Sequence, residues 1–161
     1  MGDTLVLRPA TIADAPVLAA TIAAAFEQYR GKLVPESGAF RETADGIAAE
    51  LKKDAGAIIA ERNGVILGCV MTKLEEGDLY LGRLSVLPTA RGEGLAARLI
   101  EAVEDEARRR GLPGVRLGVR VVLTGNQKRL FQSLGYREIS REAHEGFDYM
   151  TSINMRKSLS S

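Results

Sequence analysis

The sequence predicts one mixed α/β domain, built on a central sheet of about seven strands with about four helices on its two faces. Two observations support this fold class. The chain has 161 residues, and single domains cluster at roughly 100–150 residues. Strand-like apolar runs alternate with segments of helical periodicity in the order β-α-α-β-β-β-α-β-α-β-β, and such mixing puts helices against both faces of one sheet. We find no repeat or linker, and therefore assign residues 1–161 to this domain.

The first third of the chain predicts one strand and two helices. Residues 5–8, Leu-Val-Leu-Arg, form a short apolar run typical of a strand. Thr11 and Asp14 have the spacing of a helix-starting capping box. The helix that follows has one apolar face, because apolar residues recur every fourth position at Leu18, Ile22 and Phe26. A second helix is expected over residues 43–53, with Ile47 and Leu51 facing inward.

The middle of the chain predicts three consecutive strands. The apolar runs 58–60 and 65–71 flank Asn63-Gly64, a pair that favours the tight type I′ turn of a hairpin. The third strand covers residues 79–86 and ends at Pro88. Cys69, between apolar neighbours in the second of these strands, is interpreted as a core residue.

The last third predicts two helices and three strands. The first helix has an apolar face and ends at Arg108–Arg110 and Gly111, since cations and glycine are favourable at a helix C-terminus. That apolar face consists of Leu95, Leu99, Ile100, Val103 and Ala107. A strand at 115–122, a short helix at 126–134 ended by Gly135, and strands around Ile139 and residues 150–155 complete the chain.

The composition excludes several classes of protein. There are 22 basic and 21 acidic residues, for a net charge of +1, whereas a nucleic-acid-binding protein is expected to have a basic surplus. One cysteine and one histidine, His144, exclude an internal disulfide and leave few ligands for a zinc site. We expect no metal, no nucleic acid partner and no membrane association, since no apolar run approaches the roughly 18–20 residues of a membrane helix. The N-terminus has no recognisable targeting signal, which favours a cytoplasmic location.

A glycine-rich turn precedes the long helix. Its sequence is Arg91-Gly92-Glu93-Gly94-Leu95-Ala96. Small residues let the backbone approach a ligand, and the unpaired N–H groups of a helix N-terminus favour phosphate. No Walker loop is present, and a dinucleotide fingerprint is disfavoured because the turn lies in mid-chain behind a hairpin. Without further information, an ordinary strand-to-helix turn explains these residues as well as a phosphate site does.

Two blocks of sequence resemble the GNAT superfamily of acyl-CoA-dependent N-acetyltransferases. In the first, residues 84–96, the positions of Arg91, Gly94 and Ala96 match the family pattern Gln/Arg-x-x-Gly-x-Gly/Ala after a strand and "V-x-P". The second, Asn126 to Tyr136, resembles the family element N-x-x-x-x-Y-x-x-x-G-F/Y. The order of elements over residues 4–157 agrees with the family fold, a mixed but mostly antiparallel sheet.

The resemblance implies acetyl-CoA as the co-substrate and assigns its site. Backbone amides of the glycine-rich turn would hold the pyrophosphate, and a strand edge would pair with the pantetheine amides. The residues of this implied site are Arg91, Gly92, Glu93, Gly94, Leu95 and Ala96 of the turn, Leu84, Ser85 and Val86 of the strand, Asn126 on the pantetheine arm, and Phe131 beside the thiol. A backbone N–H near Ser85 would stabilise the oxyanion. Arg98, Lys128 and Arg129 are candidates for the 3′-phosphate.

The residues that move protons depart from the family pattern. Phe131 occupies the position of a tyrosine that protonates the leaving thiolate, and phenylalanine cannot donate a proton. The usual acid or histidine of the fourth strand is replaced by Tyr80 and Gly82. Tyr80 and His144 are therefore our two candidates for the catalytic base, although each also has a plain structural interpretation, as a packing aromatic or an exposed loop residue.

The leading hypothesis is an N-acetyltransferase in which an amine attacks acetyl-CoA directly in a ternary complex. One alternative is a non-catalytic acyl-CoA sensor with the same fold, which Phe131 would suit. Another is a nucleotide-binding domain of a different type. The acceptor amine, on a small molecule, peptide or protein, is not identified by the sequence, although the expected loop over residues 29–40 should border it. The resemblance also allows a homodimer.

Overall fold

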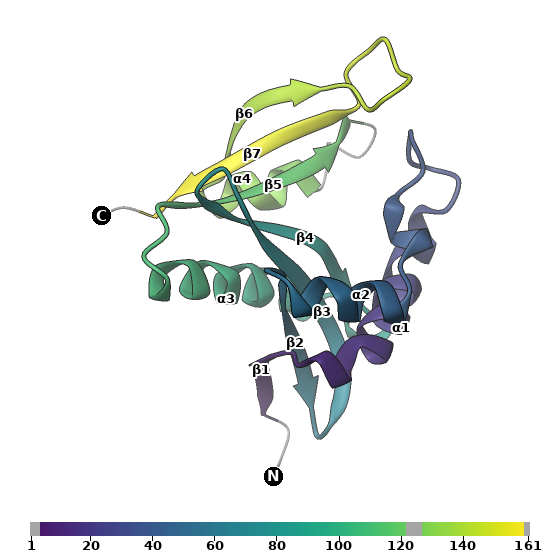
Figure 1. Cartoon of the computed structure of the whole chain (residues 1–161), viewed down its shortest axis with the longest axis vertical. Coiled ribbons are helices and arrows are strands. Elements are labelled where there is room, and N and C mark those ends of the chain that lie inside the picture. The colour runs from purple at the N-terminus through teal and green to yellow at the C-terminus, as the bar shows by residue number, and fades with distance from the viewer. Residues whose placement is uncertain (1–3, 122–126, 160–161) are drawn as a thin grey trace.

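One seven-stranded sheet forms the centre of the molecule. The computed structural model describes residues 4–121 and 127–159. The spatial order of the strands is β1-β2-β3-β4-β5-β7-β6; β4 and β5 run parallel, and the other neighbours are antiparallel. In Figure 1, β1 to β4 form the lower part of the sheet and β5 to β7 the upper part. The strands are β1 Leu5–Pro9, β2 Gly56–Arg62, β3 Val65–Glu75, β4 Asp78–Val86, β5 Gly114–Arg120, β6 Arg137–Glu142 and β7 Ser152–Ser158.

Helices cover both faces of this sheet, as predicted. α1 (Ala15–Phe26) and α2 (Ala44–Lys52) pack on one face (Figure 1), and α3 (Leu95–Arg109) packs on the other with the short α4 (Arg129–Ser133). The seven strands and four helices agree with the predicted fold class. None of the helices in the described parts of the chain is long and apolar enough to cross a membrane.

Alternation along the strands divides the core into two layers. Successive side chains of a strand point to opposite faces. On β2 and β3, therefore, Ile59 and Cys69 join the α1/α2 layer, whereas Ala60 and Val70 join the α3 layer. Cys69 is fully buried, and burial raises the pKa of its thiol to about 12. This confirms that Cys69 is a core residue.

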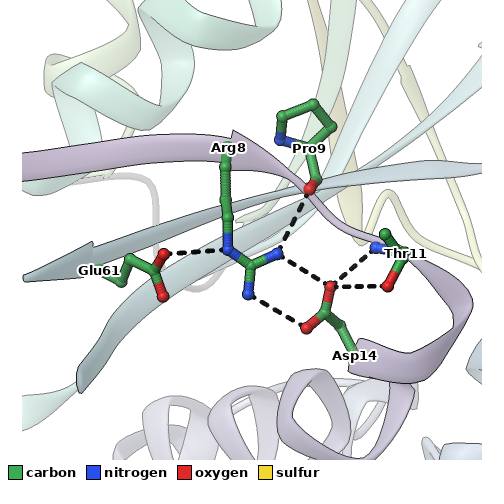
Figure 2. Close-up of polar contacts among 5 residues, drawn as sticks. All are labelled: Arg8, Pro9, Thr11, Asp14 and Glu61. Atoms are coloured by element: carbon green, nitrogen blue, oxygen red, sulfur yellow. Dashed lines mark hydrogen bonds and ion pairs between the residues drawn. The ribbon is translucent and has the colours of Figure 1, made fainter. Parts of the chain in front are cut away.

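The helix start predicted at Thr11 is displaced by one turn. A 3₁₀ turn, Ile12–Asp14, comes first, and α1 begins at Ala15. Figure 2 shows why this turn is stable: the Thr11 N–H and the Arg8 guanidinium both donate to the Asp14 carboxylate, at 2.7 and 3.0 Å. Arg8 also reaches Glu61 of β2, at 3.0 Å. These contacts fix the start of α1 against the edge of the sheet and hold the pKa of Asp14 down at about 2.

Two other predicted boundaries need correction, and a third is only partly tested. The segment expected as a loop over 29–40 contains 3₁₀ turns at Glu27–Tyr29 and Gly38–Arg41. The last strand spans 152–158 instead of 150–155, because its register is set by pairing with β5 rather than by local hydrophobicity. The α-helical part of α4 begins at Arg129, and the start predicted at Asn126 lies outside the described residues.

The parallel pair β4 and β5 meet at one end only. Two residue pairs are in register, Leu79 with Val115 and Tyr80 with Arg116, and the strands then diverge. At the closed end, the buried Asp78 accepts hydrogen bonds from Arg116 of β5 and Arg156 of β7. These arginines hold the pKa of Asp78 below its usual value. The Asp78 clasp, as we call Asp78 with Arg116 and Arg156, thus ties three strands together at the vertex of the opening.

We expect Asp78→Asn to lower the free energy of unfolding by about 3 kcal/mol or more, because it leaves the partly buried Arg156 without its carboxylate and Arg116 with only the exposed Glu76. Because the pKa of Asp78 in the folded protein lies below its usual value, the difference in stability between wild type and variant should persist at neutral pH. It should shrink in acid, as the pH falls through the lowered pKa. Urea unfolding followed by circular dichroism measures both effects.

Glu76→Gln is the matched control. Glu76 contacts the same Arg116 at 3.2 Å, but its side chain is 73% exposed, and exposed ion pairs contribute about 0–1 kcal/mol. Equal losses in the two variants would show that the clasp does not hold the sheet.

Candidate active site

A cavity of about 800 Å³ occupies the opening between β4 and β5. Its lining includes Leu117 and Phe131 from the α3 layer and Met71 from the α1/α2 layer. The cavity therefore passes between the diverging strands from one face of the sheet to the other. It reaches residues of the glycine-rich turn and also Tyr80 and His144, so both sequence blocks and both candidate bases meet in one space.

The edge of β4 that faces this opening has no partner strand beyond Tyr80. Within the described residues, β5 pairs with β4 only at residues 79 and 80. Leu84 and Val86 line the cavity, whereas the Ser85 side chain is 1% exposed and donates its hydroxyl to the Arg83 carbonyl at 2.9 Å. Ser85 thus has its side chain turned away from the opening, and any role in chemistry falls to backbone groups. This arrangement suits the predicted strand-like pairing of Leu84–Val86 with an extended ligand.

A β-bulge redirects β4 at this point. Between the pairs Cys69–Ser85 and Met71–Gly82, β4 has one residue more than β3. Arg83, in the bulge, has a φ of 51°, a left-handed conformation that is unusual for a residue with a side chain. Bulges near binding sites commonly re-aim a side chain. Here the Arg83 guanidinium lines the cavity and lies 3.4 Å from the Glu42 carboxylate.

The glycine-rich turn is anchored on both sides and open in the middle. The Arg91 guanidinium donates to the carbonyl of Ala25 in α1 at 3.1 Å, and Glu93 pairs with Arg62 of β2 at 3.0 Å. Gly92 and Gly94 have φ values of 86° and 77°, and a Cβ built on either meets no atom within 4 Å. Leu95 is buried in the core while Ala96 lines the cavity. The charge of Glu93 is therefore offset by Arg62, and the backbone N–H groups before α3 are accessible to an anion.

Part of the second sequence block, residues 126–136, also lines the cavity. Phe131 is 6% exposed, packs edge-to-face on Tyr136 at 5.9 Å and lines the cavity. Lys128 is paired with Glu138 at 2.9 Å, while Arg98 and Arg129 are exposed. Asn126, predicted to bind the pantetheine arm, lies outside the described residues.

Tyr80 is the centre of a polar cluster on the α1/α2 side of the cavity. A Cβ built on Gly118 would lie 3.2 Å from the Tyr80 hydroxyl, 3.5 Å from Ser152 Oγ and 3.9 Å from Asn154 Oδ1. Three oxygen atoms thus converge over one glycine, because the absence of a Cβ lets the Tyr80 hydroxyl lie close to β5. Burial, the main cause, raises the pKa of Tyr80, so the phenol keeps its proton at neutral pH.

His144 lies at the same end of the cavity, but both of its ring nitrogens are engaged. Arg120 Nη1 is 3.0 Å from Nε2, and Nδ1 contacts Thr151 Oγ1. A guanidinium only donates, so Nε2 accepts and the neutral ring carries its proton on Nδ1. Burial and the charge of Arg120 lower the pKa of His144, against the opposing effect of Glu142. To act as a base, His144 must first release Arg120.

The structure adds functional candidates that sequence reasoning missed. Arg41, Arg83 and Arg120 line the α1/α2 side of the cavity, and Tyr29 accepts a hydrogen bond of 2.8 Å from Gln127 across its mouth. The signal available in the sequence was Gly82 and Gly118, since a lone glycine inside a strand suggests that another group approaches closely. Within residues 4–121 and 127–159, no group of three or more His, Cys, Asp or Glu side chains is placed to hold a metal ion.

The chain's one histidine makes the site easy to probe. We expect NMR titration to give His144 a pKa below 6.5 with the Nδ1–H tautomer when neutral. Arg120→Gln should raise this pKa by removing a repelling charge, and Glu142→Gln should lower it. Arg141→Gln is the control, because Arg141 pairs with Glu138 on β6. A pKa that is unchanged in Arg120→Gln would contradict the contact.

Comparison with known proteins identifies the family. Residues 20–136 match the model of the Acetyltransferase (GNAT) family. An "IAA acetyltransferase" of Azospirillum brasilense is 31% identical over 119 residues, which cover 73% of this chain and 74% of that protein.

Solved structures agree in fold. The PaiA N-acetyltransferase of Thermoplasma acidophilum, in complex with coenzyme A, superposes with a TM-score of 0.78 at 17% identity, covering 96% of this chain and 99% of its own. The putative acetyltransferase yncA of Salmonella typhimurium, with acetyl-CoA, gives 0.75 at 19% identity, covering 97% and 94%. The sheet, the anchored turn before α3 and these matches lead to one conclusion: the chain belongs to the GNAT family of acetyltransferases and is an acyltransferase.

Proposed function

We propose that this protein transfers the acetyl group of acetyl-CoA to an amine, by direct attack while both substrates are bound. The observation that carries the proposal is the single cavity that joins the unpaired β4 edge and the anchored turn to the polar cluster over Gly118. A thioester held along β4 and an amine held at the cluster would enter from opposite faces of the sheet and meet between the strands.

The cofactor half of the site has the chemistry that acetyl-CoA requires. The open backbone of Arg91–Ala96 and the N-terminus of the fifteen-residue α3 offer N–H groups to a pyrophosphate. The free edge of β4 offers main-chain groups to the amides of the pantetheine arm, and Phe131 offers an apolar wall to the thiol end. The complexes of two structural relatives with coenzyme A and acetyl-CoA support this choice of ligand.

The reaction needs one charge stabilised and the protons of the attacking amine removed. When the amine attacks the thioester carbonyl, the oxyanion that forms would accept a hydrogen bond from a backbone N–H near Ser85. The attacking nitrogen must lose protons, and a water at the Tyr80, Ser152 and Asn154 oxygens would carry them away. Because its pKa is raised, Tyr80 would act as a relay in its protonated form and not as a free phenolate base.

The leaving group needs little help. Phe131 has no proton to give, but a thiol with a pKa near about 8.5 leaves as a thiolate far more readily than an alkoxide would. Proton transfer to the thiolate then falls to water or to Tyr29, whose hydroxyl lies at the cavity mouth against Gln127. His144 serves in our scheme to hold Arg120 in place rather than as the base.

A turnover assay tests the proposal against the acyl-CoA sensor. Purified protein is incubated with acetyl-CoA and a broad panel of amines, and the free thiol released is measured above the amine-free background. Turnover with any amine excludes the sensor. Tight binding of CoA without turnover across the panel would instead support it and contradict acetyl transfer.

Gly94→Asp tests the phosphate site. A carboxylate in front of α3 would repel the pyrophosphate, and we expect calorimetry to show CoA affinity lowered at least about 10-fold, equivalent to about 1.4 kcal/mol. Gly64→Asp is matched in backbone terms, since Gly64 has the same φ of 77° and equal space, but lies in the β2–β3 turn. Similar affinities in the two variants would show that the turn before α3 does not hold phosphate.

Tyr80→Phe tests the relay. Removing one hydroxyl from the cluster should lower kcat by about 100-fold or more, the usual contribution of a positioned proton-transfer group, and leave the Kd for CoA unchanged. Steady-state kinetics and calorimetry on the same preparation separate the two effects. A variant with wild-type kcat would remove Tyr80 from the mechanism.

A further inference from the structure

We propose that the acceptor carries a carboxylate beside its amine, and that Arg120, with Arg41 and Arg83, binds it. This inference rests on the proposed acetyl transfer and adds the chemical class of the substrate. It comes from the arginines on the α1/α2 side of the cavity, which the cofactor site does not use.

Two of the arginines converge from different parts of the chain. A Cβ built on Gly38 would lie 2.6 Å from Arg83 Nη2 and 3.4 Å from Arg41 Nη2. Both guanidinium groups therefore reach the same small volume, and the glycine leaves space for them. Arg83 is brought there by the bulge in β4 and Arg41 by the 3₁₀ turn Gly38–Arg41. Like charges repel, so holding two cations together favours an anion between or beside them.

Arg120 is the third cation, and its contact is with a neutral ring. Its guanidinium meets His144 Nε2 at 3.0 Å, and no carboxylate of the described residues forms an ion pair with it. Burial, and the charges of Arg83 and Arg41, lower the pKa of Arg120. Placing a charged group in a partly buried site without a counter-ion is costly, and a ligand carboxylate would relieve that cost.

Carboxylates also line the cavity near these arginines. Glu42 accepts from Arg83 at a long 3.4 Å, and the exposed Glu142 lies close enough to influence His144 and Tyr80. Lys73, over the Tyr80 ring at 5.3 Å, offsets the nearby Glu75. Glu50 also lines the cavity. Four carboxylates therefore accompany Arg41, Arg83, Arg120 and Lys73, and the case for an acceptor carboxylate rests on Arg120, which forms no ion pair with a carboxylate of the described residues.

The spacing of the two polar groups fits one small molecule. Gly118 and Arg120 are two residues apart on β5, so they face the same side of the sheet roughly 7 Å from each other. An amine over Gly118, at the Tyr80 hydroxyl and Asn154 Oδ1, would have a carboxylate a few bonds away within reach of Arg120. Asn154 is oriented for this, because its Nδ2 donates to Ser140 at 3.0 Å and leaves Oδ1 for the amine.

The test compares acceptors that differ only in the carboxylate. Alanine, leucine, phenylalanine and methionine are each assayed beside their primary carboxamides, with β-alanine and γ-aminobutyrate varying the distance between the groups. The readout is kcat/KM from thiol release. We expect at least one carboxylate to exceed its carboxamide about 10-fold or more, the contribution of a charge-assisted hydrogen bond. Converting the carboxylate to an amide lowers the pKa of the neighbouring amine, so the carboxamide is the easier of the two to deprotonate. A faster reaction of the carboxylate therefore cannot be explained by the reactivity of its amine.

Arg120→Gln should reduce this ratio to near one, and Arg41→Gln, at an exposed position where folding is not at risk, should lower it in the same direction. Arg109→Gln removes a surface charge at the far end of α3 and should leave the ratio unchanged. Carboxamides that react as fast as carboxylates would overturn the inference while acetyl transfer stands. Turnover of no amine at all would overturn both, and CoA binding in that preparation would show that the protein is folded.

Discussion

The opening between β4 and β5 depends on the Asp78 clasp. A parallel pair of strands with only two residue pairs in register has little to keep it at a fixed angle. The buried carboxylate of Asp78 supplies a fixed point, because its two arginines come from the next two strands of the sheet. The cavity widens away from this vertex, so its walls are held by charge-assisted contacts at one end and by the two apolar layers along their length.

The strand β4 serves two purposes because its two ends are built differently. Near Asp78 it pairs on both edges and belongs to the sheet. Past Tyr80 it pairs with β3 alone, and the bulge at Arg83 turns one side chain toward the α1/α2 side of the cavity. The turn that follows is tied to α1 through Arg91 and to β2 through Glu93. The β4 edge and the turn proposed to bind the cofactor therefore lie on one continuous stretch with Tyr80 and Arg83, residues 80–96. The other groups proposed to bind the acceptor, Arg41, Arg120 and Asn154, come from elsewhere in the chain.

Local sequence was sufficient for the order of the elements and for the turn that borders the cavity before α3. The order of strands and helices, the hairpin at Asn63-Gly64, the core position of Cys69 and the glycine-rich turn before α3 all follow from patterns within a few residues. Ends of elements were less predictable where tertiary pairing decides them, as at β7, whose register is set by β5. Residues 122–126 stay outside the comparison, and with them the predicted role of Asn126.

The arginines of the proposed acceptor site could not be predicted, because they come together only through the fold. Arg41, Arg83 and Arg120 stand far apart in the sequence, and each looks there like an ordinary surface charge. The bulge that aims Arg83 is marked in the sequence only by the neighbouring Gly82, which does not indicate which side chain is redirected. His144 could be selected from the sequence because it is the one histidine. Its contact with Arg120, which determines the tautomer of the ring, could not be predicted, because it depends on how the β6–β7 loop lies over the end of β5.

The unpaired stretch of β4 is an edge in the interior of a sheet. On the outside of a molecule, such a row of free N–H and C=O groups invites strands of other copies and leads to aggregation. Here those groups face a cavity of about 800 Å³, which a slender, amide-bearing ligand can enter but a strand with its own side chains would fill poorly. The free N–H and C=O groups of β4 are thus available to a ligand but not to strands of other protein molecules. Any ligand that pairs with this edge also completes the sheet. Its binding should therefore raise the free energy of unfolding of the protein.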